Sequence, residues 1–599
     1  MEQLECVAFF VLCTTLFASA TASPHQGASY LKMVVNATEL PPEDYYDYIV
    51  VGGGTAGCPL AATLSQSFRV LVLERGGVGS GNPDLINQEG FLSNLLNAEN
   101  EDSPAQAFIS EEGVPNARGR VLGGSSAINA GFYSRAHRDF FVKSGLPWDL
   151  ALVNHSYRWV EKEIVFRPNL KTWQSAVRDG LLEAGVTPYN GFTLDHAEGT
   201  KIGGSTFDGS GTRHTSADLL RHARSSNIKV AVHATVERLL LAGSSAIGAL
   251  YRDQMGGHHH AFLREHGEVI LSAGAIGSPQ LLLLSGIGPR PYLSSWGIPV
   301  AHHLPYVGHF LYDNPRNGIT ILPSLPLDHS LIQVVGITDS GAYIEAASNV
   351  IPFTSPRHTT FVRSPLYLTV ATIISKISGP LSAGFLRLAS TNVDANPRVR
   401  FNYFHNPVDL ERCVNGTRKI AQILGSRALK DFKFSNWLGE PDFRFIGPAL
   451  PLHQTDYPRM ADFCRRTVST IWHYHGGCVV SRVVDPNLKV IGMDSLRIVD
   501  GSVFSVSPGT NPQATLMMLG RYICLVFLSL SLTVSLFHYF HIQNHTLIIM
   551  ILFLQVFWVE DYQRKERIQM MLTAFHFLLH RQTLYSFILP VHFELQRLR

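Results

Sequence analysis

The chain has 599 residues, and its 49 Lys and Arg nearly balance its 47 Asp and Glu, giving a formal net charge of +2 at pH 7. Only 16% of the residues are charged, against roughly 25% in an average soluble domain, while 45% are hydrophobic. This composition excludes a disordered tail protein and a nucleic-acid-binding protein with a broad basic face. It indicates a chain that buries a large core.

The first 22 residues have the layout of a cleavable secretory signal. An apolar run from Val7 to Phe17 is followed by small residues that offer Ala-x-Ala cleavage sites. The preceding segment holds two glutamates and no basic residue, so an uncleaved membrane anchor is the alternative. Sequons at Asn36, Asn154 and Asn415 add support for secretion. We therefore expect a glycoprotein that is secreted or resides in the cell wall or endomembrane lumen.

A nucleotide-binding βαβ unit is predicted between residues 46 and 74. The β-branched and aromatic run Tyr46–Val51 is typical of a buried strand, and it leads directly into the glycine-rich turn Gly52–Gly57. A helix from Pro59 to Leu64 and a second strand from Val70 follow, and this strand ends at the acidic Glu74. The spacing is that of a G-x-G-x-x-G motif in the context that dinucleotide binding requires.

Each residue of this motif has a physical role. Gly52 permits the tight turn, Gly54 lets the backbone approach a pyrophosphate at the helix N-terminus, and Gly57 allows the helix to pack closely on the strand. Glu74 can accept a hydrogen bond from a ribose hydroxyl. The motif alone does not distinguish NAD from FAD.

Further glycine-rich segments identify a family. Arg118–Gly131 resembles the first signature of the glucose-methanol-choline (GMC) flavoprotein oxidoreductases, and Ser272–Gly288 resembles the second. Leu496–Ser502 and Asn511–Thr515 resemble the family's C-terminal flavin segment. The resemblance extends from about Tyr46 to Tyr522, and its motifs occur in the family's order.

The resemblance implies an α/β fold in two parts. One is a Rossmann-like FAD-binding domain, discontinuous in sequence, built from residues 42–145, 200–310 and 470–521. The other is an α+β substrate-binding domain with an antiparallel sheet, built from residues 146–199 and 311–469.

The resemblance also implies one cofactor, FAD, and the residues that contact it. Beside Gly52, Gly54, Gly57 and Glu74, these are Thr55, Ala56, Arg120, Gly124, Ser125, Asn129, Ala130, Val236, Trp472, His473, Asp500, Gly501, Asn511 and Gln513.

The cysteines do not have the spacing of zinc ligands, so no metal site is expected. In an oxidising compartment Cys413 and Cys464 could form a disulfide, but spacing alone does not choose among the pairs. The two match a bridged pair in the (R)-mandelonitrile lyases of the family, and this resemblance favours that disulfide.

The predicted chemistry lies in the segment Ser469–Cys478. His473 and His475 point to the same face of an extended segment and could bind a metal, but no third ligand lies near them in the sequence. The family match instead makes His473 the catalytic base beside the flavin and leaves His475 a structural role. It places the second catalytic residue at Asn511, where the family carries either His or Asn.

Two reactions are open for this site, oxidation of an alcohol and cleavage of a cyanohydrin. The sequence is similar to a plant subgroup that contains HOTHEAD-like proteins and (R)-mandelonitrile lyases. The lyases carry a second catalytic His at the position of Asn511 and a Tyr at that of Ile471. They also carry a substrate-contacting Cys in the stretch that corresponds to Gly341–Ala347.

These departures favour oxidation of an alcohol CH–OH group by hydride transfer to flavin N5. The HOTHEAD resemblance suggests a long-chain hydroxy fatty acid as the substrate. The alternatives are cyanohydrin cleavage, which releases cyanide and benzaldehyde with a non-redox FAD, and a catalytically idle FAD-binding glycoprotein. We expect a small-molecule alcohol or cyanohydrin as the partner and no nucleic acid; the sequence does not give the oligomeric state or the electron acceptor.

The last 78 residues, 522–599, differ from the rest. Residues 522–559 contain no charged side chain, which formally suits one or two membrane spans. Each apolar stretch is shorter than the roughly 20 residues that cross a bilayer, and three histidines interrupt them. Membrane association through this tail is therefore doubtful, and translated non-coding sequence is the favoured explanation.

Overall fold

The computed structural model describes residues 29–541, except 97, 99–102, 349–368 and 436–438. The predicted signal and the tail from residue 542 onward lie outside the described residues. The chain divides into two compact units, Met1–Leu525 and Val526–Arg599. The fold described below is that of the first unit.

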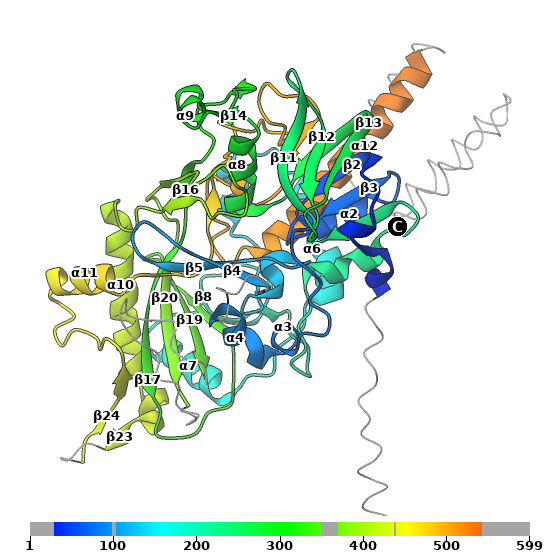
Figure 1. Ribbon diagram of the computed structural model, residues 1–599. Helices are drawn as coiled ribbons and strands as arrows, with labels where there is room; N and C mark the ends of the chain where they lie inside the picture. Colours follow the sequence, from blue (N-terminus) through cyan, green and yellow to red (C-terminus); the bar gives the residue numbers. More distant parts are fainter. Residues whose placement is uncertain (1–28, 97, 99–102, 349–368, 436–438, 542–599) are drawn as a thin grey trace, which may run out of the picture. The chain divides into compact units, whose positions relative to one another are not determined.

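The first sheet carries the predicted βαβ unit. Its strand order is β1-β10-β3-β2-β13-β12-β11, and β28 pairs with β13 (Figure 1). Strands β1, β10, β3, β2, β13 and β28 pair in parallel, whereas β12 is antiparallel to β11 and β13. The strands are β1 (Val34–Asn36), β2 (Glu43–Val51), β3 (Val70–Leu73), β10 (Ile228–Val232), β11 (Thr235–Ala242), β12 (Ser245–Arg252), β13 (His258–Leu271) and β28 (Leu496–Ile498).

Burial explains why the first strands read as apolar runs. Every residue of β3 is buried, as are the last three of β2, because a central parallel strand is covered on both faces. Helix α2 (Gly57–Leu64) joins the two strands and is buried along its whole length. The predicted strand, glycine turn, helix and second strand are therefore confirmed.

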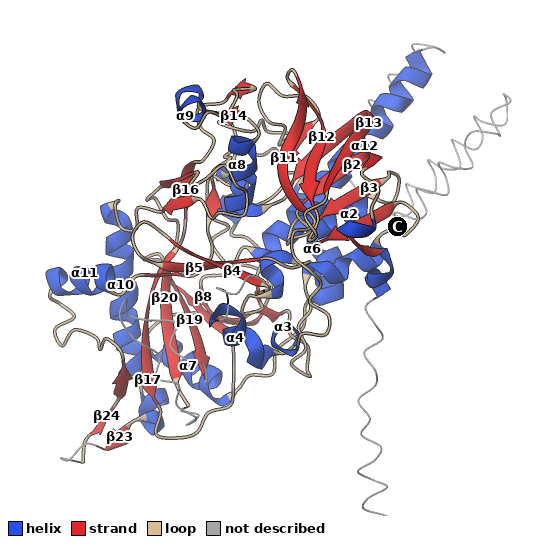
Figure 2. Ribbon diagram, viewed as in Figure 1, coloured by secondary structure: helices blue, strands red, loops and turns tan. Residues whose placement is uncertain are grey.

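The second sheet is almost wholly antiparallel and has the order β25-β17-β20-β19-β18-β8-β7, with β26 beside β17. Figure 2 shows its strands as a group separate from the first sheet, with helices α7 (Thr172–Glu183) and α10 (Pro407–Leu424) along it. The strands are β7 (Tyr189–Phe192), β8 (Gly199–Ile202), β17 (Pro315–Leu322), β18 (Val334–Ile337), β19 (Ala342–Ser348), β20 (Ala371–Ile377), β25 (Arg444–Ile446) and β26 (Ser469–Thr470).

The two faces of this sheet differ. Ile319, Ile344 and Ile373 pack with residues of α7 and α10 in one apolar core. Side chains alternate between faces along a strand, so the neighbours of these isoleucines face the other way. Glu345 and Ile374 are such neighbours, and both line the cavity described below.

The remaining helices and strands connect or flank the sheets. They are α3 (Pro83–Ile86), α4 (Phe91–Leu96), α5 (Arg138–Lys143), α6 (Leu150–Ile164), α8 (Gly274–Leu284), α9 (Arg290–Ser295), α11 (Tyr457–Arg466), α12 (Gln513–His541), β4 (Ala105–Ile109), β5 (Pro115–Gly119), β6 (Phe132–Tyr133), β9 (Gly204–Ser205), β14 (Ile287–Gly288), β15 (His302–His303), β16 (His309–Tyr312), β21 (Gly384–Arg387), β22 (Arg398–Arg400), β23 (Phe434–Ser435), β24 (Pro441–Asp442) and β27 (His475–Gly476).

The strand pairing bears on the two segments predicted to begin at residues 42 and 200. Strand β1 lies before residue 42 and pairs with β10, so the first sheet begins earlier than that segment. Strand β8 starts at Gly199 and pairs with β18, so its residues belong to the second sheet. The antiparallel second sheet itself agrees with the predicted fold class.

Helix α12 passes without a break through the position where the tail was expected to begin. Tyr522 and Cys524 on this helix are buried, and Tyr522 accepts a hydrogen bond at its hydroxyl from the Asp149 backbone N–H at 3.0 Å. Among the described residues, no helix is long and apolar enough to span a bilayer.

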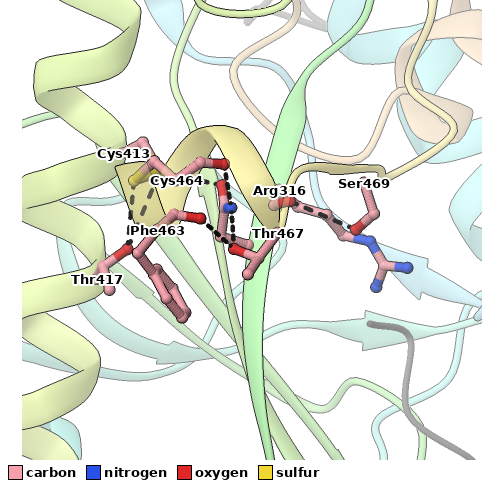
Figure 3. The surroundings of a disulfide bond; sticks show 8 residues. Arg316, Cys413, Thr417, Phe463, Cys464, Thr467 and Ser469 are labelled. Carbon is pink, nitrogen blue, oxygen red and sulfur yellow. Dashed lines mark hydrogen bonds between the residues drawn. A yellow bond between two sulfur atoms is a disulfide. The ribbon is translucent and has the colours of Figure 1, made fainter. Parts of the chain in front are cut away.

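The predicted disulfide between Cys413 and Cys464 is present. It joins α10 to α11, and the structure shows three free cysteines, all buried, in the part of the chain that it describes. Figure 3 shows the helix end beyond Cys464, where the Thr467 hydroxyl donates to the Phe463 carbonyl at 2.8 Å. Ser469 follows directly, so the disulfide anchors the helix that leads into the segment carrying His473.

Replacing both Cys413 and Cys464 by alanine should lower the free energy of unfolding by about 4 kcal/mol, because the bridge closes a loop of 51 residues. Urea denaturation followed by tryptophan fluorescence measures this loss. Cys478→Ala is the matched control, since it changes a buried cysteine that forms no bridge. An equal loss in both proteins would show that the disulfide contributes only packing.

Candidate active site

One cavity is lined by residues of both sheets and by nearly all the predicted site residues. Only Gly57 and Arg120 lie outside it. A Cβ on Gly57 would stand 2.0 Å from the Gly52 carbonyl oxygen, so this glycine serves the close approach of α2 to the turn. The Nε of Arg120 donates to the Ser103 carbonyl at 3.1 Å. The predicted residues that line the cavity are Gly52, Gly54, Thr55, Ala56, Glu74, Gly124, Ser125, Asn129, Ala130, Val236, Trp472, His473, Asp500, Gly501, Asn511 and Gln513.

The glycine turn fits a bound pyrophosphate. A Cβ on Gly54 would meet no protein atom closer than 3.8 Å, and the residue has no positive φ, so neither packing nor backbone conformation requires glycine there. Gly54 lines the cavity, and a side chain would fill that space. Helix α2 begins beside it without a side-chain cap. A phosphate group at this helix end explains both features.

Glu74 stands at the end of β3 and is almost fully buried. Its two carboxylate oxygens accept from the backbone N–H groups of Gly53 at 3.0 Å and Gly76 at 2.8 Å. Burial raises the pKa of Glu74 to about 7, although the two backbone donors and Arg75 oppose the rise. The carboxylate is thus held at the cavity wall with lone pairs left for a ribose hydroxyl.

Side-chain amides and a carboxylate fasten the other cofactor loops. Asn129 donates to Gln513 at 2.9 Å, and Gln513 donates to the Phe132 carbonyl at 2.7 Å, which ties the first signature to the start of α12. Asp500 accepts from the Gly274 N–H at 2.9 Å and from the Ser278 hydroxyl at 2.5 Å. Hydrogen bonds within the protein therefore hold together the segments that line the cavity.

Replacing Glu74 by glutamine should weaken FAD binding about tenfold or more, because a hydrogen bond to a charged acceptor is lost and the new amide N–H faces a backbone donor. Titration of the apoprotein with FAD measures the change in Kd. Glu161→Gln is the control, since this carboxylate pairs with Arg135 and does not line the cavity. A wild-type Kd in Glu74→Gln would contradict a cofactor role for Glu74.

His473 lies between the short strands β26 and β27. Its backbone N–H donates to Asp313 at 3.1 Å, and the preceding Trp472 adopts a positive φ of 59°. Trp472 is fixed in turn by a hydrogen bond from its N–H to the Thr470 hydroxyl at 2.7 Å and by Arg316 over its ring at 4.9 Å. This strained turn presents the His473 imidazole to the cavity.

The surroundings of His473 keep its imidazole neutral. Burial, and then the positive charges of Lys376 and Arg316, lower the pKa of His473 well below its ordinary value of 6.5. Its Nδ1 is buried and has no hydrogen-bond partner among the described residues. A neutral imidazole is the form that accepts a proton.

Asn511 lines the same cavity as His473, and Lys376 orients it. The Lys376 ammonium donates to Oδ1 of Asn511 at 3.5 Å. Because an ammonium is only a donor, the amide oxygen must face it, and the amide N–H₂ faces elsewhere. This N–H₂ group interacts with Glu345, and because it carries two N–H bonds it can also donate to a ligand in the cavity.

His475 packs away from the cavity, which agrees with a structural role. Its Nδ1 lies 3.0 Å from the His473 carbonyl, and its ring stacks on Tyr312 at 5.1 Å between centroids. It does not line the cavity. Burial lowers the pKa of His475 to about 4.

Three charged residues in or next to the cavity wall were not predicted from the sequence. Arg316 and Glu345 line it, and Lys376 contacts Asn511. A signal was present, because Glu345 and Lys376 are the lone charged residues of β19 and β20, whose other residues are apolar or uncharged. Their meeting depends on strand register, since Tyr343 pairs with Lys376 and Glu345 with Ile374.

The fold and the cavity define a dinucleotide-binding enzyme whose second sheet supplies the wall around a buried imidazole. Two models of the GMC oxidoreductase family match the chain, the N-terminal one over residues 46–316 and the C-terminal one over 380–520. The chain belongs to the GMC oxidoreductase family, as its signatures predicted, and its cofactor is FAD.

Named relatives include both reaction types. The chain is 68% identical to an "(R)-mandelonitrile lyase-like" protein of Arabidopsis thaliana, over 83% of this chain and 92% of that protein. It is 50% identical to "Sinalpyl alcohol oxidase Nec3" of Nesocodon mauritianus, over 85% and 93%. It is 48% identical to "(R)-mandelonitrile lyase 1" of Prunus serotina, over 84% and 90%.

Among solved structures, formate oxidase has the same fold. Its structure covers 81% of this chain and 98% of its own, with a TM-score of 0.69 and 20% identity.

Proposed function

We propose that this protein oxidises the CH–OH group of an alcohol. The observation that carries the proposal is the pairing, in the FAD cavity, of one neutral imidazole at His473 with one oriented amide donor at Asn511. FAD, when bound, supplies the hydride acceptor for this chemistry. The relative named as an alcohol oxidase supports the proposal.

The two side chains divide the work on the substrate oxygen. The neutral His473 imidazole takes the hydroxyl proton, and negative charge develops on the oxygen as the C–H bond weakens. The Asn511 amide N–H₂ donates a hydrogen bond to that oxygen, and its preorganised direction stabilises the charge. The Lys376 and Arg316 charges near His473 add to the same stabilisation.

Cyanohydrin cleavage is the second candidate, and the relatives named as lyases favour it. That reaction needs a base for the hydroxyl proton and a proton for the departing cyanide. Asn511 neither gives nor takes a proton near neutral pH, so His473 would have to perform both transfers. Oxidation requires only one base, which suits the single imidazole better.

One experiment separates the two candidates. The holoenzyme is mixed anaerobically with a panel of aliphatic and benzylic alcohols, including long-chain hydroxy fatty acids, and separately with mandelonitrile. Bleaching of the flavin absorption by an alcohol is the expected result. Cyanide release without bleaching would assign the lyase reaction. If neither bleaching nor cyanide release occurs, the protein is an idle FAD-binding protein.

The lowered pKa of His473 predicts an unusual pH profile. As pH falls through 6.5 an ordinary histidine becomes protonated, but His473 stays neutral to lower pH, so kcat/KM should decline only below pH 6.5. Lys376→Met removes a nearby positive charge, raises the pKa of His473 and should move this decline to higher pH. A decline at pH 6.5 or above in the wild-type enzyme would contradict the assignment.

We also infer passage through the secretory pathway. The disulfide and the exposed sequon residue Asn154 on α6 support an oxidising compartment with glycosylation. A shift in mass on treatment of plant-expressed protein with an N-glycosidase tests this inference.

A further inference from the structure

A buried carboxylate with no close hydrogen-bond donor in the part of the chain that the structure describes lies in the wall of the cavity that His473 and Asn511 also line. Glu345 is 0% exposed in the middle of β19, and it lines the cavity together with His473 and Asn511. Neither of its oxygens has a hydrogen-bond partner among the described residues. Buried carboxylates are nearly always hydrogen-bonded, so this one calls for a ligand.

The neighbouring cation balances its charge from beyond hydrogen-bond distance, and no donor of the described chain makes a close hydrogen bond to its oxygens. The Lys376 ammonium lies 3.7 Å from Oε1 of Glu345, beyond hydrogen-bond distance. That ammonium donates to Asn511 and stands 3.9 Å from the centre of the Tyr343 ring. Burial raises the pKa of Glu345, and the charge of Lys376 and the Asn511 amide oppose the rise.

Apolar residues also line this cavity. They include Ile332, Ile374 and Ile471, and Glu345 shares the cavity face of the sheet with Ile374, its register partner. Specific ligand pockets have this composition, with a few placed polar groups in an apolar surface. If an apolar part of the substrate lay against Glu345, both carboxylate oxygens would stay without hydrogen-bond partners. The desolvation of these oxygens would then lower the affinity for that substrate.

We propose that Glu345 is a specificity residue that accepts a hydrogen bond from a second hydroxyl group of the substrate, phenolic or aliphatic. The inference rests on the proposed function in one respect, which is that the reacting hydroxyl group is the one that His473 deprotonates. The substrate class is then an alcohol with a further hydroxyl. A bare alkyl chain, or a carboxylate at that position, fits the wall poorly.

Equilibrium binding to the holoenzyme tests this without turnover. Phenol and anisole have nearly the same shape, but only phenol carries a hydroxyl donor, and neither contains an alcohol carbon or a cyanohydrin. Their Kd values are measured under anaerobic conditions from the perturbation of the flavin absorption spectrum. We expect phenol to bind at least tenfold more tightly than anisole, as a hydrogen bond to a buried carboxylate implies.

Two variants identify the acceptor. Glu345→Met should remove the preference for phenol. Glu345→Gln combined with Lys376→Met is uncharged, so it leaves no unpaired buried charge if the single variant fails to fold, and it should reduce the preference because its amide oxygen is a weaker acceptor. Equal binding of phenol and anisole by the wild type, or a preference that survives both changes, would overturn the proposal. Because no turnover is involved, these outcomes do not depend on whether the enzyme oxidises alcohols.

Discussion

His473→Ala should slow anaerobic flavin reduction by an alcohol about a thousandfold, within the range expected for loss of a general base. The imidazole is neutral, buried and without a protein partner at Nδ1 among the described residues, so its removal leaves no other group to take the hydroxyl proton. FAD should stay bound, because the glycine turn and Glu74 that fit the nucleotide lie on the first sheet. Stopped-flow absorbance at the flavin band measures the rate.

The adjacent histidine provides the matched control for this variant. His475 is equally buried but faces Tyr312 rather than the cavity, so His475→Gln should change the rate of flavin reduction less than tenfold. Rates near wild type in a folded, FAD-loaded His473→Ala protein would show that another group is the base. Equal losses in both variants would point to a general disturbance of the segment.

The second large effect is expected at Asn511. Asn511→Leu keeps the size of the side chain and removes the amide donor, so the rate of flavin reduction should fall about a hundredfold, as for loss of one preorganised donor to a developing oxyanion. The decrease should appear in the rate at saturating alcohol more than in KM, because the charge exists only in the transition state.

Asn511→His is the control, since an imidazole also donates a hydrogen bond. This variant should keep the rate within about tenfold of wild type. If Asn511→Leu were as fast as Asn511→His, the amide would have no part in the chemical step.

The nucleotide half of the site could be predicted from sequence because it is local. Tyr46–Val51, the glycine turn and Glu74 lie within 30 residues, and their geometry follows from one βαβ unit. The resemblance to GMC oxidoreductases then supplied His473 and Asn511, which lie far from this unit in the chain. Among the residues singled out for the cofactor, Arg120 is turned toward Ser103 instead of the cavity.

The substrate half could not be predicted in the same way, because it depends on non-local pairing. Glu345 and Lys376 come together only through the register of β19 on β20. The apolar alternation of each strand tells which residues share a face, but it does not tell which strand lies alongside. For this reason the sequence did not reveal that Lys376 and Arg316 lie near His473 and lower its pKa.

The rate of anaerobic flavin reduction by an alcohol deuterated at its CH–OH carbon tests the central claim most directly. The best alcohol of the panel is compared with its labelled form in single-turnover experiments. Hydride loss from that carbon predicts a reduction several times slower with deuterium. Equal rates for the two forms, with the flavin fully reduced, would contradict hydride loss as the step that His473 and Asn511 promote.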